Sequence, residues 1–575
     1  MWNLYHDGRL VPPLIYSDGR TQEDVVDDII DAFKTHRVVV LHGSVGTGKS
    51  AIALNVVSAY SRGGIIVVPT KMLEEQYRKD YANKGAYQIL RDGKRPLTIS
   101  AIKGRGNFRC RLTNTSCKNK TLPCVRALKD GEKRAEVAFT CPYYSPITYK
   151  RACKKMAEKF GGECERCYED IAGNIRCIFT RDRKKVCRYY GQFRGYCDDV
   201  VMMNSAIYLI ETLITGRKPL KDVEVIDECD FFLDNLTFTE KVSKRRIEKI
   251  TKDVNKLGLE GLPLVRDCNE LISTFNKATI QSYRGVARDV DIGVLKKLTH
   301  IFAELSGTEE LSEESNLSLL LRYANHLYVD VNSLNSSITY FIPDMRVMVS
   351  KILRRSTKRI LLMSATPHNS EVLKNVFGLS DFAMVYGEVK HQGEIRLCKT
   401  QQEEVISHTK WQSFGFREKM HHTLSEILKK ATPPTLIQVH AYKYLQDGMR
   451  ELLKKRKVVI LKNGEMNATF STTMTRGIDL KDDKCRSIVL LKCPYPNLQS
   501  PILQSMKEFV GEEAFWQYYH NIMMRNLIQY VGRGLRHKDD WVEVWSPDRL
   551  VHTFLLKYWR GKITVFEKSN EHQMF

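Results

Sequence analysis

A glycine-rich segment near the start of the chain carries the residues needed to bind the phosphates of a nucleotide. It reads GSVGTGKS and follows a short β-branched run, RVVVLH, at residues 37–42. In a loop of this pattern backbone N–H groups close around phosphates, the lysine contacts the β- and γ-phosphates, and the hydroxyl binds Mg²⁺. We therefore predict that ATP and Mg²⁺ bind here, through Gly43, Gly46, Thr47, Gly48, Lys49 and Ser50.

Two acids end a second apolar run, VEVIDECD, at residues 223–230. We predict that Asp227 holds Mg²⁺, directly or through water, and that Glu228 orients and deprotonates the attacking water. An acid pair after a strand often only caps the next helix. The assignment of this pair to catalysis therefore depends on the phosphate loop upstream.

A third segment, NLIQYVGRGLRH at residues 526–537, places two arginines three residues apart. Side chains at this spacing share one face of a helix. We predict that Arg533 and Arg536 reach across a cleft and stabilise charge on the γ-phosphate, as arginine fingers do. A basic surface turn of a helix is the alternative.

Ten of the fifteen cysteines lie between Cys110 and Cys197, between the phosphate loop and the acidic motif. In an intracellular ATPase, cysteines at this density ligate a metal more often than they form disulfides. The pattern therefore indicates a metal or iron–sulfur module inserted into a nucleotide-binding domain.

The elements that must hold these residues alternate between strands and helices. Strands are expected at 37–42 and 63–70, with a helix at 51–60 between them, and this order predicts a parallel α/β sheet. Residues 233–345 are rich in Lys, Glu, Leu, Asn and Ser and are expected to be mostly helical. From about residue 375 a second α/β unit is expected, with strands at 434–440, 457–462 and 487–496.

The composition favours a polyanionic partner. Lysine and arginine total 90 against 67 acids, a net charge of +23, although a solvated basic surface gives the same balance. The sequence has no run of 18 apolar residues, and its start lacks the layout of a secretory signal, so neither a membrane span nor secretion is expected. The expected location is the cytoplasm in a prokaryote or the nucleus in a eukaryote.

Taken in order, these motifs resemble those of superfamily-two helicases, and specifically of the XPD/DinG group, which carries an iron–sulfur cluster. PTKMLEEQY resembles motif Ia, SATP motif III, TRGIDL motif V and QYVGRGLRH motif VI. KGRGNFRC and VVMMNSAIYL resemble the segments before and after the cluster. The chain departs from the group at DECD, where the family usually has DEAH, and this leaves open how Asp230 replaces a histidine that couples the ATP state to domain closure.

The resemblance implies an α/β fold with two RecA-like P-loop motor domains, the first interrupted by an iron–sulfur cluster insert and a helical, Arch-like insert. The expected boundaries are 1–103, 199–232 and 346–374 for motor domain 1, 104–198 for the iron–sulfur domain, 233–345 for the Arch-like domain and 375–575 for motor domain 2.

The resemblance also implies roles for further residues. Arg20 and Gln22 resemble the adenine-recognising Q motif, while Asp479 and Gln529 complete the ATP site from the second domain. Single-stranded DNA is expected to contact Thr70, Lys71, His440 and Thr475. In the insert, RDRKKVCRYY mixes cations with tyrosines that can stack on bases, and the candidates there are Tyr189, Tyr190 and Arg194. A solvated loop with core tyrosines is the alternative.

A [4Fe–4S] cluster needs four thiolates. The contexts KGRGNFRC and CRYY imply Cys110 and Cys187 as the outer ligands, and Cys124 and Cys141 are chosen for the middle pair. The competing set is the C-x-x-C pair Cys164 and Cys167, with Cys177. A separate zinc site that uses these three with Cys153 or Cys197 is a further alternative, and so is a set of reduced, free thiols.

The activity that the resemblance implies is an ATP-dependent DNA helicase that translocates 5′ to 3′ on single-stranded DNA, separates duplexes and serves DNA repair or genome maintenance. The expected partners are single-stranded and forked DNA, with RNA–DNA hybrid as a further candidate, and the expected state is a monomer. The alternative is an ATP-switched nucleic-acid-binding regulator without processive unwinding. Motifs III, V and VI disfavour a P-loop kinase or a transporter ATPase. An interaction scaffold with a zinc fold would require that the catalytic residues be missing, and they are present in the sequence.

Overall fold

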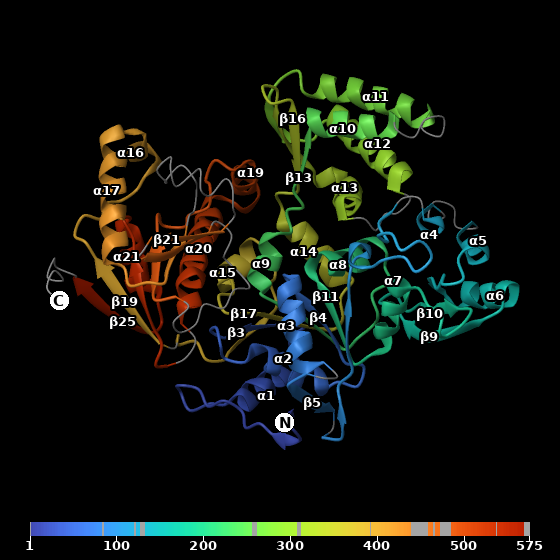
Figure 1. Ribbon diagram of the computed structural model, residues 1–575, viewed down its shortest axis with the longest axis horizontal. Helices are drawn as coiled ribbons and strands as arrows, with labels where there is room; N and C mark the ends of the chain where they lie inside the picture. Colours follow the sequence, from blue (N-terminus) through green and yellow to red (C-terminus); the bar gives the residue numbers. More distant parts are fainter. Residues whose placement is uncertain are drawn as a thin grey trace.

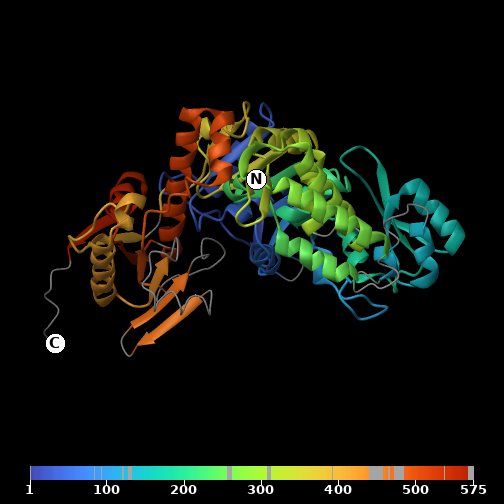
Figure 2. The same cartoon turned by 90° about the horizontal axis from the view of Figure 1, so that it is seen from above.

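Two seven-stranded sheets organise the chain (Figure 1). The computed structural model describes residues 2–82, 85–91, 93–119, 122–126, 133–255, 262–306, 312–391, 393–438, 458–463, 466–471, 485–535 and 538–567. In Figures 1 and 2 the second sheet lies at one end of the molecule, the insert at 104–198 lies at the other, and the insert at 233–345 lies between and above them.

The first sheet is parallel throughout and runs in the order β18-β3-β17-β12-β4-β11-β7. Alternate residues of its strands enter two different cores: Val38 and Val40 belong to one, Val39 and Leu41 to the other. A sheet covered on both faces explains these unbroken apolar runs. The strands are β3 (Val38–His42), β4 (Gly64–Val68), β7 (Ile99–Ile102), β11 (Val200–Asn204), β12 (Val223–Asp227), β17 (Arg359–Ser364) and β18 (Ala383–Tyr386).

Helices follow the strands that carry the motifs. The phosphate loop leads from β3 into α2 (Lys49–Ser58), and the acidic motif leads from β12 into α9 (Cys229–Asp234). Because all strands are parallel, their carboxyl ends meet at one edge of the sheet, where ligands bind in open α/β folds. The other helices around this sheet are α1 (Gln22–Ala32), α3 (Lys71–Tyr81), α8 (Ser205–Leu209), α14 (Met345–Arg354) and α15 (Ser370–Asn375).

The second sheet runs in the order β21-β22-β20-β23-β24-β19-β25 and is parallel except for the β21–β22 pair. Its strands are β19 (Glu394–Lys399), β20 (Thr435–Gln438), β21 (Val458–Asn463), β22 (Met466–Ser471), β23 (Ser487–Leu490), β24 (Trp541–Trp545) and β25 (Lys562–Glu567). Its helices include α16 (His408–Gln412), α17 (Phe414–Lys430), α19 (Pro501–Val510), α20 (Glu512–Val531) and α21 (Arg549–Tyr558).

The expected boundary of the second domain at residue 375 is corrected by β18. This strand pairs with β3 in the first sheet, from Ala383↔Val39 to Tyr386↔His42. The chain therefore leaves the first domain after Tyr386 and enters the second at β19, which starts at Glu394.

The insert at 104–198 is built on a three-stranded antiparallel sheet, β8-β10-β9, with strands β8 (Ile147–Tyr149), β9 (Glu163–Glu169) and β10 (Ile175–Thr180). Helix α6 (Lys150–Phe160) packs on β9 and β10, as the contacts between these elements show. Shorter helices carry the cysteine-bearing turns: α4 (Pro123–Arg126), α5 (Lys133–Thr140) and α7 (Arg188–Gly191), the last followed by a 3₁₀ turn at Gln192–Cys197.

The insert at 233–345 contains the expected helices and also a sheet that the sequence did not predict. The helices are α10 (Lys244–Asn255), α11 (Leu262–Ala278), α12 (Asp289–Ser306) and α13 (Ser312–Arg322). The antiparallel sheet β13-β16-β15-β14 consists of β13 (Glu240–Ser243), β14 (Tyr283–Val286), β15 (Tyr328–Asn332) and β16 (Ser337–Phe341). Its strands are short and far apart in the sequence, so no local alternation revealed them.

A small antiparallel sheet, β2-β1-β5-β6, closes the amino-terminal end of the first domain. It consists of β1 (Leu4–His6), β2 (Arg9–Leu10), β5 (Tyr87–Arg91) and β6 (Arg95–Pro96). Within the described ranges, every helix is too short or too polar to cross a bilayer.

Candidate functional site

The phosphate loop depends on glycine for its shape. Gly46 and Gly48 have φ angles of 83° and 72°, in the left-handed region that favours glycine. A Cβ on Gly48 would also lie 2.1 Å from Nε2 of Gln22. The Lys49 ammonium donates to the carbonyl oxygens of Gly43 and Ser44, at 2.9 and 3.0 Å, so the side chain lies along the loop.

Gln22 is bound directly to the phosphate loop. Its Nε2 donates to the carbonyl oxygen of Thr47 at 3.1 Å, and its Oε1 accepts from the N–H of Leu14 at 2.9 Å. The Tyr16 hydroxyl donates to the same Thr47 oxygen at 3.3 Å. Arg20, in contrast, is held at the surface by Asp28 and by the carbonyl oxygen of Tyr386.

Glu388, which the sequence did not single out, also contacts the phosphate loop. Its buried carboxylate accepts from the N–H and the hydroxyl of Ser17, at 2.7 and 3.1 Å, and its carbonyl oxygen accepts from the N–H of Ser44 at 2.6 Å. Its position just after β18 explains why sequence reasoning missed it, since that strand was not predicted.

Asp227 lies at the end of β12, next to the phosphate loop. Its two carboxylate oxygens accept from the Tyr77 hydroxyl and from the N–H of Glu228, each at 2.9 Å. Burial and the neighbouring Glu228 carboxylate raise the pKa of Asp227 to about 7, against the opposing charge of Lys49. A buried carboxylate with an incomplete set of partners is suited to a divalent cation.

Tyr77, a further residue that the sequence analysis did not assign, links the two expected magnesium ligands. It is buried on α3, and its hydroxyl hydrogen-bonds to both Ser50 and Asp227. The segment PTKMLEEQY contained this tyrosine, but nothing in its spacing indicated that the side chain points at the acidic motif.

Glu228 has an unusual backbone. It starts α9 with φ 51° and ψ 49°, in the left-handed region that a residue with a side chain rarely adopts. Such strain costs about 1–3 kcal/mol and is concentrated at functional sites. Glu228 is half-buried and lies between the last residue of β12, Asp227, and the first residue of α9.

Asp230, the fourth residue of DECD, connects the two domains. Its carboxylate accepts from the Ser364 hydroxyl at 2.8 Å within the first domain. From the second domain, Nη2 of Arg525 donates to it at 2.8 Å and Nε2 of Gln529 at 3.1 Å. Gln529 also donates to the Thr366 hydroxyl at 2.8 Å, so motif VI is joined to motif III.

Arg525 is the centre of this interdomain network. It is 2% exposed and also donates to Asp234 at 2.8 Å and to the ring of His368 at 2.9 Å. Burial alone would raise the pKa of Asp234, but Arg525 and His368 hold it well below its usual range. Hydrogen bonds from a guanidinium to carboxylates are charge-assisted and roughly twice as strong as those between neutral groups.

Several expected residues of the second domain lie outside the described parts of the chain: Arg536, His440, Thr475 and Asp479. Arg533 lies in a 3₁₀ turn at Gly532–Gly534, directly after α20. Of the DNA candidates in the first domain, Thr70 accepts from the N–H of Leu73 at 3.2 Å and caps α3, while the exposed Lys71 donates to Asn107 at 3.1 Å.

The four expected cluster ligands come together in the structure. Cys110, Cys124, Cys141 and Cys187 are half-buried free thiols, and the charges of these sulfurs influence one another. The pKa of Cys141 is raised to about 11, mainly by burial and further by the charges of the neighbouring thiols. Cys117, buried beside them with a pKa raised by burial to about 12, is a fifth thiol that the sequence analysis did not choose.

Donors surround these thiols. Backbone N–H groups of Tyr189 and Tyr190 hydrogen-bond to the Cys187 sulfur, and Arg105 hydrogen-bonds to Cys124. Hydrogen bonds to sulfur and reduced solvent access tune iron–sulfur clusters, so the residues fit such a group. As they are placed in the described part of the chain, no three His, Cys, Asp or Glu side chains form a group that could hold a metal ion.

The proposed base-stacking role of Tyr189 and Tyr190 is corrected by their burial. They are 4% and 3% exposed, and Arg105 lies over the Tyr189 ring and donates to the Tyr190 hydroxyl at 2.9 Å. Arg194 is likewise engaged, since its guanidinium pairs with Glu165. The two tyrosines belong to the core of the insert and do not present a surface to nucleic acid, whereas the Arg194 side chain remains partly exposed.

A basic hollow lies beside the cluster thiols instead. It has a volume of about 360 Å³ and is lined by Cys110, Arg111, Asn114, Tyr143, Lys184, Lys185 and Arg188. All four cations are exposed. Cations that converge in this way are suited to phosphate groups.

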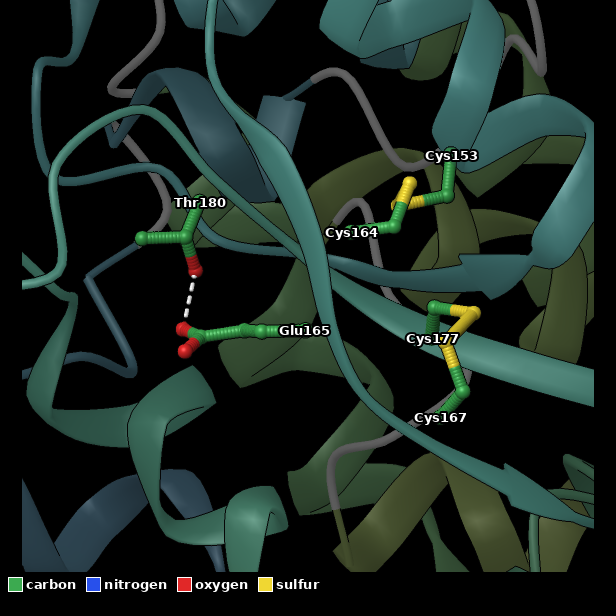
Figure 3. The surroundings of a disulfide bond; sticks show 6 residues. All are labelled: Cys153, Cys164, Glu165, Cys167, Cys177 and Thr180. Atoms are coloured by element: carbon green, nitrogen blue, oxygen red, sulfur yellow. Dashed lines mark hydrogen bonds between the residues drawn. A yellow bond between two sulfur atoms is a disulfide. The ribbon is translucent and has the colours of Figure 1, made fainter.

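The competing cysteines are paired as two disulfides, Cys153–Cys164 and Cys167–Cys177 (Figure 3). The cysteine density favoured metal ligation over disulfides, whereas in this oxidised form of the chain these four cysteines are joined in pairs. The free cysteines of the insert include the four expected cluster ligands, Cys110, Cys124, Cys141 and Cys187.

Comparisons with known proteins show which proteins parts of this chain are similar to. A family model described as "Helicase C-terminal domain" matches residues 396–560, and one described as "Type III restriction enzyme, res subunit" matches residues 17–114. The ATP-dependent DNA helicase CHL1 of Candida albicans is 28% identical over 93 residues, 14% of this chain and 11% of that protein. CHL1 of Meyerozyma guilliermondii is 32% identical over 81 residues, 12% of this chain and 10% of that protein. The matched segments thus span about a tenth of the length of these relatives.

Solved structures match over nearly the whole chain. A structure titled XPD_Helicase has a TM-score of 0.60 at 15% identity and covers 95% of this chain and 99% of its own. The S. tokodaii Xpd4 structure has a TM-score of 0.50 at 15% identity and covers 94% and 99%. At this identity the likeness shows the fold. The expected α/β fold with two RecA-like domains is confirmed, and so is the resemblance to XPD/DinG-type superfamily-two helicases.

Proposed function

We propose that this chain, an XPD/DinG-type superfamily-two helicase by its motifs and its fold, hydrolyses ATP to translocate on single-stranded DNA and separate duplexes. The observation that carries the proposal is the contact of Arg525 and Gln529 with Asp230. Through it the second domain contacts α9, the helix that begins directly after Glu228, beside the expected magnesium and phosphate ligands. A change at the γ-phosphate would thereby alter the contact between the two domains.

The ATP site would form at the carboxyl ends of β3 and β12. Gln22 would recognise the base from its place against the phosphate loop, and Lys49 and Ser50 would bind phosphate and Mg²⁺. Asp227 would hold Mg²⁺ while Tyr77 fixes its orientation, and Glu228 would orient the attacking water. Arg533 would approach the γ-phosphate from the second domain.

An iron–sulfur cluster would be held by Cys110, Cys124, Cys141 and Cys187, with zinc as the alternative occupant. Such a cluster supplies a rigid cross-link between loops that otherwise have few regular elements. Arg105, Tyr189 and Tyr190 would hold the ligand-bearing turns in place from the core of the insert.

Single-stranded DNA would contact Lys71 in the first domain and the cations beside the cluster: Arg111, Lys184, Lys185 and Arg188. The net charge of +23 supports a polyanionic partner. A path from the motor edge to the insert would bring the strand past the cluster domain, where a forked duplex would part. We propose a role in DNA repair or genome maintenance, and 5′ to 3′ polarity, on the resemblance to the helicase group.

Duplexes with a 5′ tail, a 3′ tail or an RNA strand test this function, with protein of known iron content. We expect ATP-dependent separation of the 5′-tailed and forked duplexes. ATP binding with no strand separation on any of them would instead support an ATP-switched nucleic-acid-binding regulator.

A further inference from the structure

Four cysteines of the insert at 104–198 lie on one face of its three-stranded sheet, apart from the proposed cluster ligands. Cys153 comes from α6, Cys164 and Cys167 from β9, and Cys177 from β10. Figure 3 shows the two pairs, Cys153–Cys164 and Cys167–Cys177, as neighbours. Cys153 and Cys177 are fully buried, while Cys164 and Cys167 lie toward the surface.

A β-bulge brings the C-x-x-C pair onto one face. In a regular strand, residues three apart point to opposite faces because side chains alternate. In β9 the pairing with β10 shifts between Glu165↔Ile178 and Tyr168↔Arg176, so that two residues of β9 face Cys177 alone. One of them, Arg166, has a left-handed backbone with φ 48°. The extra residue returns Cys167 to the face that Cys164 occupies.

The sheet register then places the two cysteine pairs next to each other. Cys164 faces Phe179, and Cys177 lies two residues before Phe179 on the same side of β10. Diagonal neighbours of this kind on a sheet face are about 7–8 Å apart between Cα atoms, and their Cβ atoms are somewhat closer. Helix α6 packs on this face and adds Cys153, whose Cα lies 5.9 Å from that of Cys164.

We propose that the reduced protein binds one Zn²⁺ ion through Cys153, Cys164, Cys167 and Cys177. Tetrahedral Cys₄ coordination is one of the usual forms of structural zinc site, often with a C-x₂-C pair, and each sulfur lies about 2.3 Å from the metal. A dithiol reductant supplies two electrons and two protons to each disulfide, which gives four thiols. Zinc then displaces their four protons and leaves a tetrathiolate centre that ties α6 to β9 and β10.

This site is independent of the helicase activity and of the cluster, so the metal content of ligand variants tests it. The full chain is purified under a reductant and without air, and zinc and iron are measured by mass spectrometry. We expect about one zinc per chain in addition to iron. Cys177→Ser should lose the zinc and keep the iron, whereas Cys187→Ser should lose the iron and keep the zinc.

Cys197→Ser is the matched control. The Cys197 sulfur lies 3.7 Å from the carbonyl oxygen of Cys167, but it is neither paired nor on the strands that carry the four ligands. The variant should keep its zinc. The ligand set would be overturned if Cys197→Ser lost its zinc while Cys177→Ser kept it. It would also be overturned if only Cys187→Ser lost zinc.

Cobalt substitution tests the same site in the unmutated chain, so the result does not depend on whether the serine variants fold. Co²⁺ is added to the reduced, zinc-stripped full chain, with circular dichroism as the check of folding. A tetrathiolate site gives intense thiolate-to-cobalt absorption and tetrahedral d–d bands, which zinc then abolishes. Absence of these bands in folded, reduced protein, or persistence of both disulfides in a thiol count under reductant, would refute the proposal.

Discussion

Arg525 of the second domain donates from a single nitrogen, Nη2, to Asp230 and Asp234 of the first, at 2.8 Å in each case. Both Arg525 and Asp230 are almost completely buried. In the helicase group that the chain resembles, a histidine usually stands where Asp230 lies. The contact therefore answers in structural terms how an acid is accommodated there: it pairs with an arginine and an amide from the opposite domain.

Removal of Arg525 should uncouple the domains. Arg525→Ala leaves Asp230 buried without its cation, and loss of one member of a buried pair costs about 3–5 kcal/mol. We expect DNA-stimulated ATP hydrolysis to fall roughly tenfold or more, with a smaller change in the KM for ATP. Arg486→Ala is the matched control, because Arg486 pairs with Asp540 within the second domain, at 2.9 Å. An equal loss in both variants would mean that Arg525 only stabilises the fold.

Lys49→Ala should abolish ATP hydrolysis. The lysine is the cation of the phosphate loop, and removal of one preorganised charge at a phosphoryl-transfer site costs about a hundredfold or more in rate. Phosphate release measured with and without single-stranded DNA checks this. Lys34→Ala, at the surface with a local pair to Asp31, serves as the control. Full activity in Lys49→Ala would remove the assignment of this loop.

Tyr77→Phe should weaken the use of magnesium. The change removes the hydroxyl that binds Asp227 and Ser50, a loss of about 1 kcal/mol for one hydrogen bond, or roughly fivefold in the Mg²⁺ concentration at half-maximal hydrolysis. Tyr81→Phe, on the next turn of the same helix, should leave that concentration unchanged. The same Mg²⁺ dependence in Tyr77→Phe and in the wild type would show that Tyr77 does not position the ligands.

The basic hollow should contribute to DNA affinity. The variant in which Lys184, Lys185 and Arg188 are changed to Ala should bind single-stranded DNA more weakly, and the slope of log Kd against log salt should fall by about 0.7 for each lost phosphate contact. Fluorescence anisotropy across a salt series measures both. Arg183→Ala is the control from the same loop, since Arg183 pairs with Glu163. An unchanged slope in the triple variant would place the strand elsewhere.

The cluster ligands can be separated from the fifth thiol by iron content. Cys187→Ser should lose iron and lose strand separation to a greater extent than ATP hydrolysis, because the ligand-bearing turns lose their cross-link. Cys117→Ser should keep its iron, since Cys117 is the most buried of the five. If Cys117→Ser loses its iron, and a serine variant of one of the other four cysteines keeps it, then Cys117 is a ligand in place of that cysteine.

The parts that the sequence predicted well are those set by local pattern. The phosphate loop, the acid pair and the parallel sheet around them depend on glycine positions and on unbroken apolar runs, and they lie where expected. The sheet in the insert at 233–345 and the pairing of β18 with β3 depend on partners far away in the sequence. No local pattern reveals such pairing, and one domain boundary was misplaced as a result.

Side-chain surroundings were the least predictable part of the site. Tyr189 and Tyr190 sit within a basic segment that suggested base stacking, yet their rings face Arg105 and the core. Tyr77 and Glu388 reach the ATP site only through the way α3 and the segment after β18 pack against the phosphate loop. Arg525 was overlooked because its partners, Asp230 and Asp234, lie almost 300 residues upstream.

Strand separation by iron-loaded protein tests the account most directly. Wild-type protein and Lys49→Ala are compared on a 5′-tailed and a 3′-tailed DNA duplex, with ATP and Mg²⁺, by the release of a labelled strand. The account predicts release from the 5′-tailed duplex by the wild type alone. Hydrolysis or binding of ATP by iron-loaded wild type without release from either duplex would contradict it.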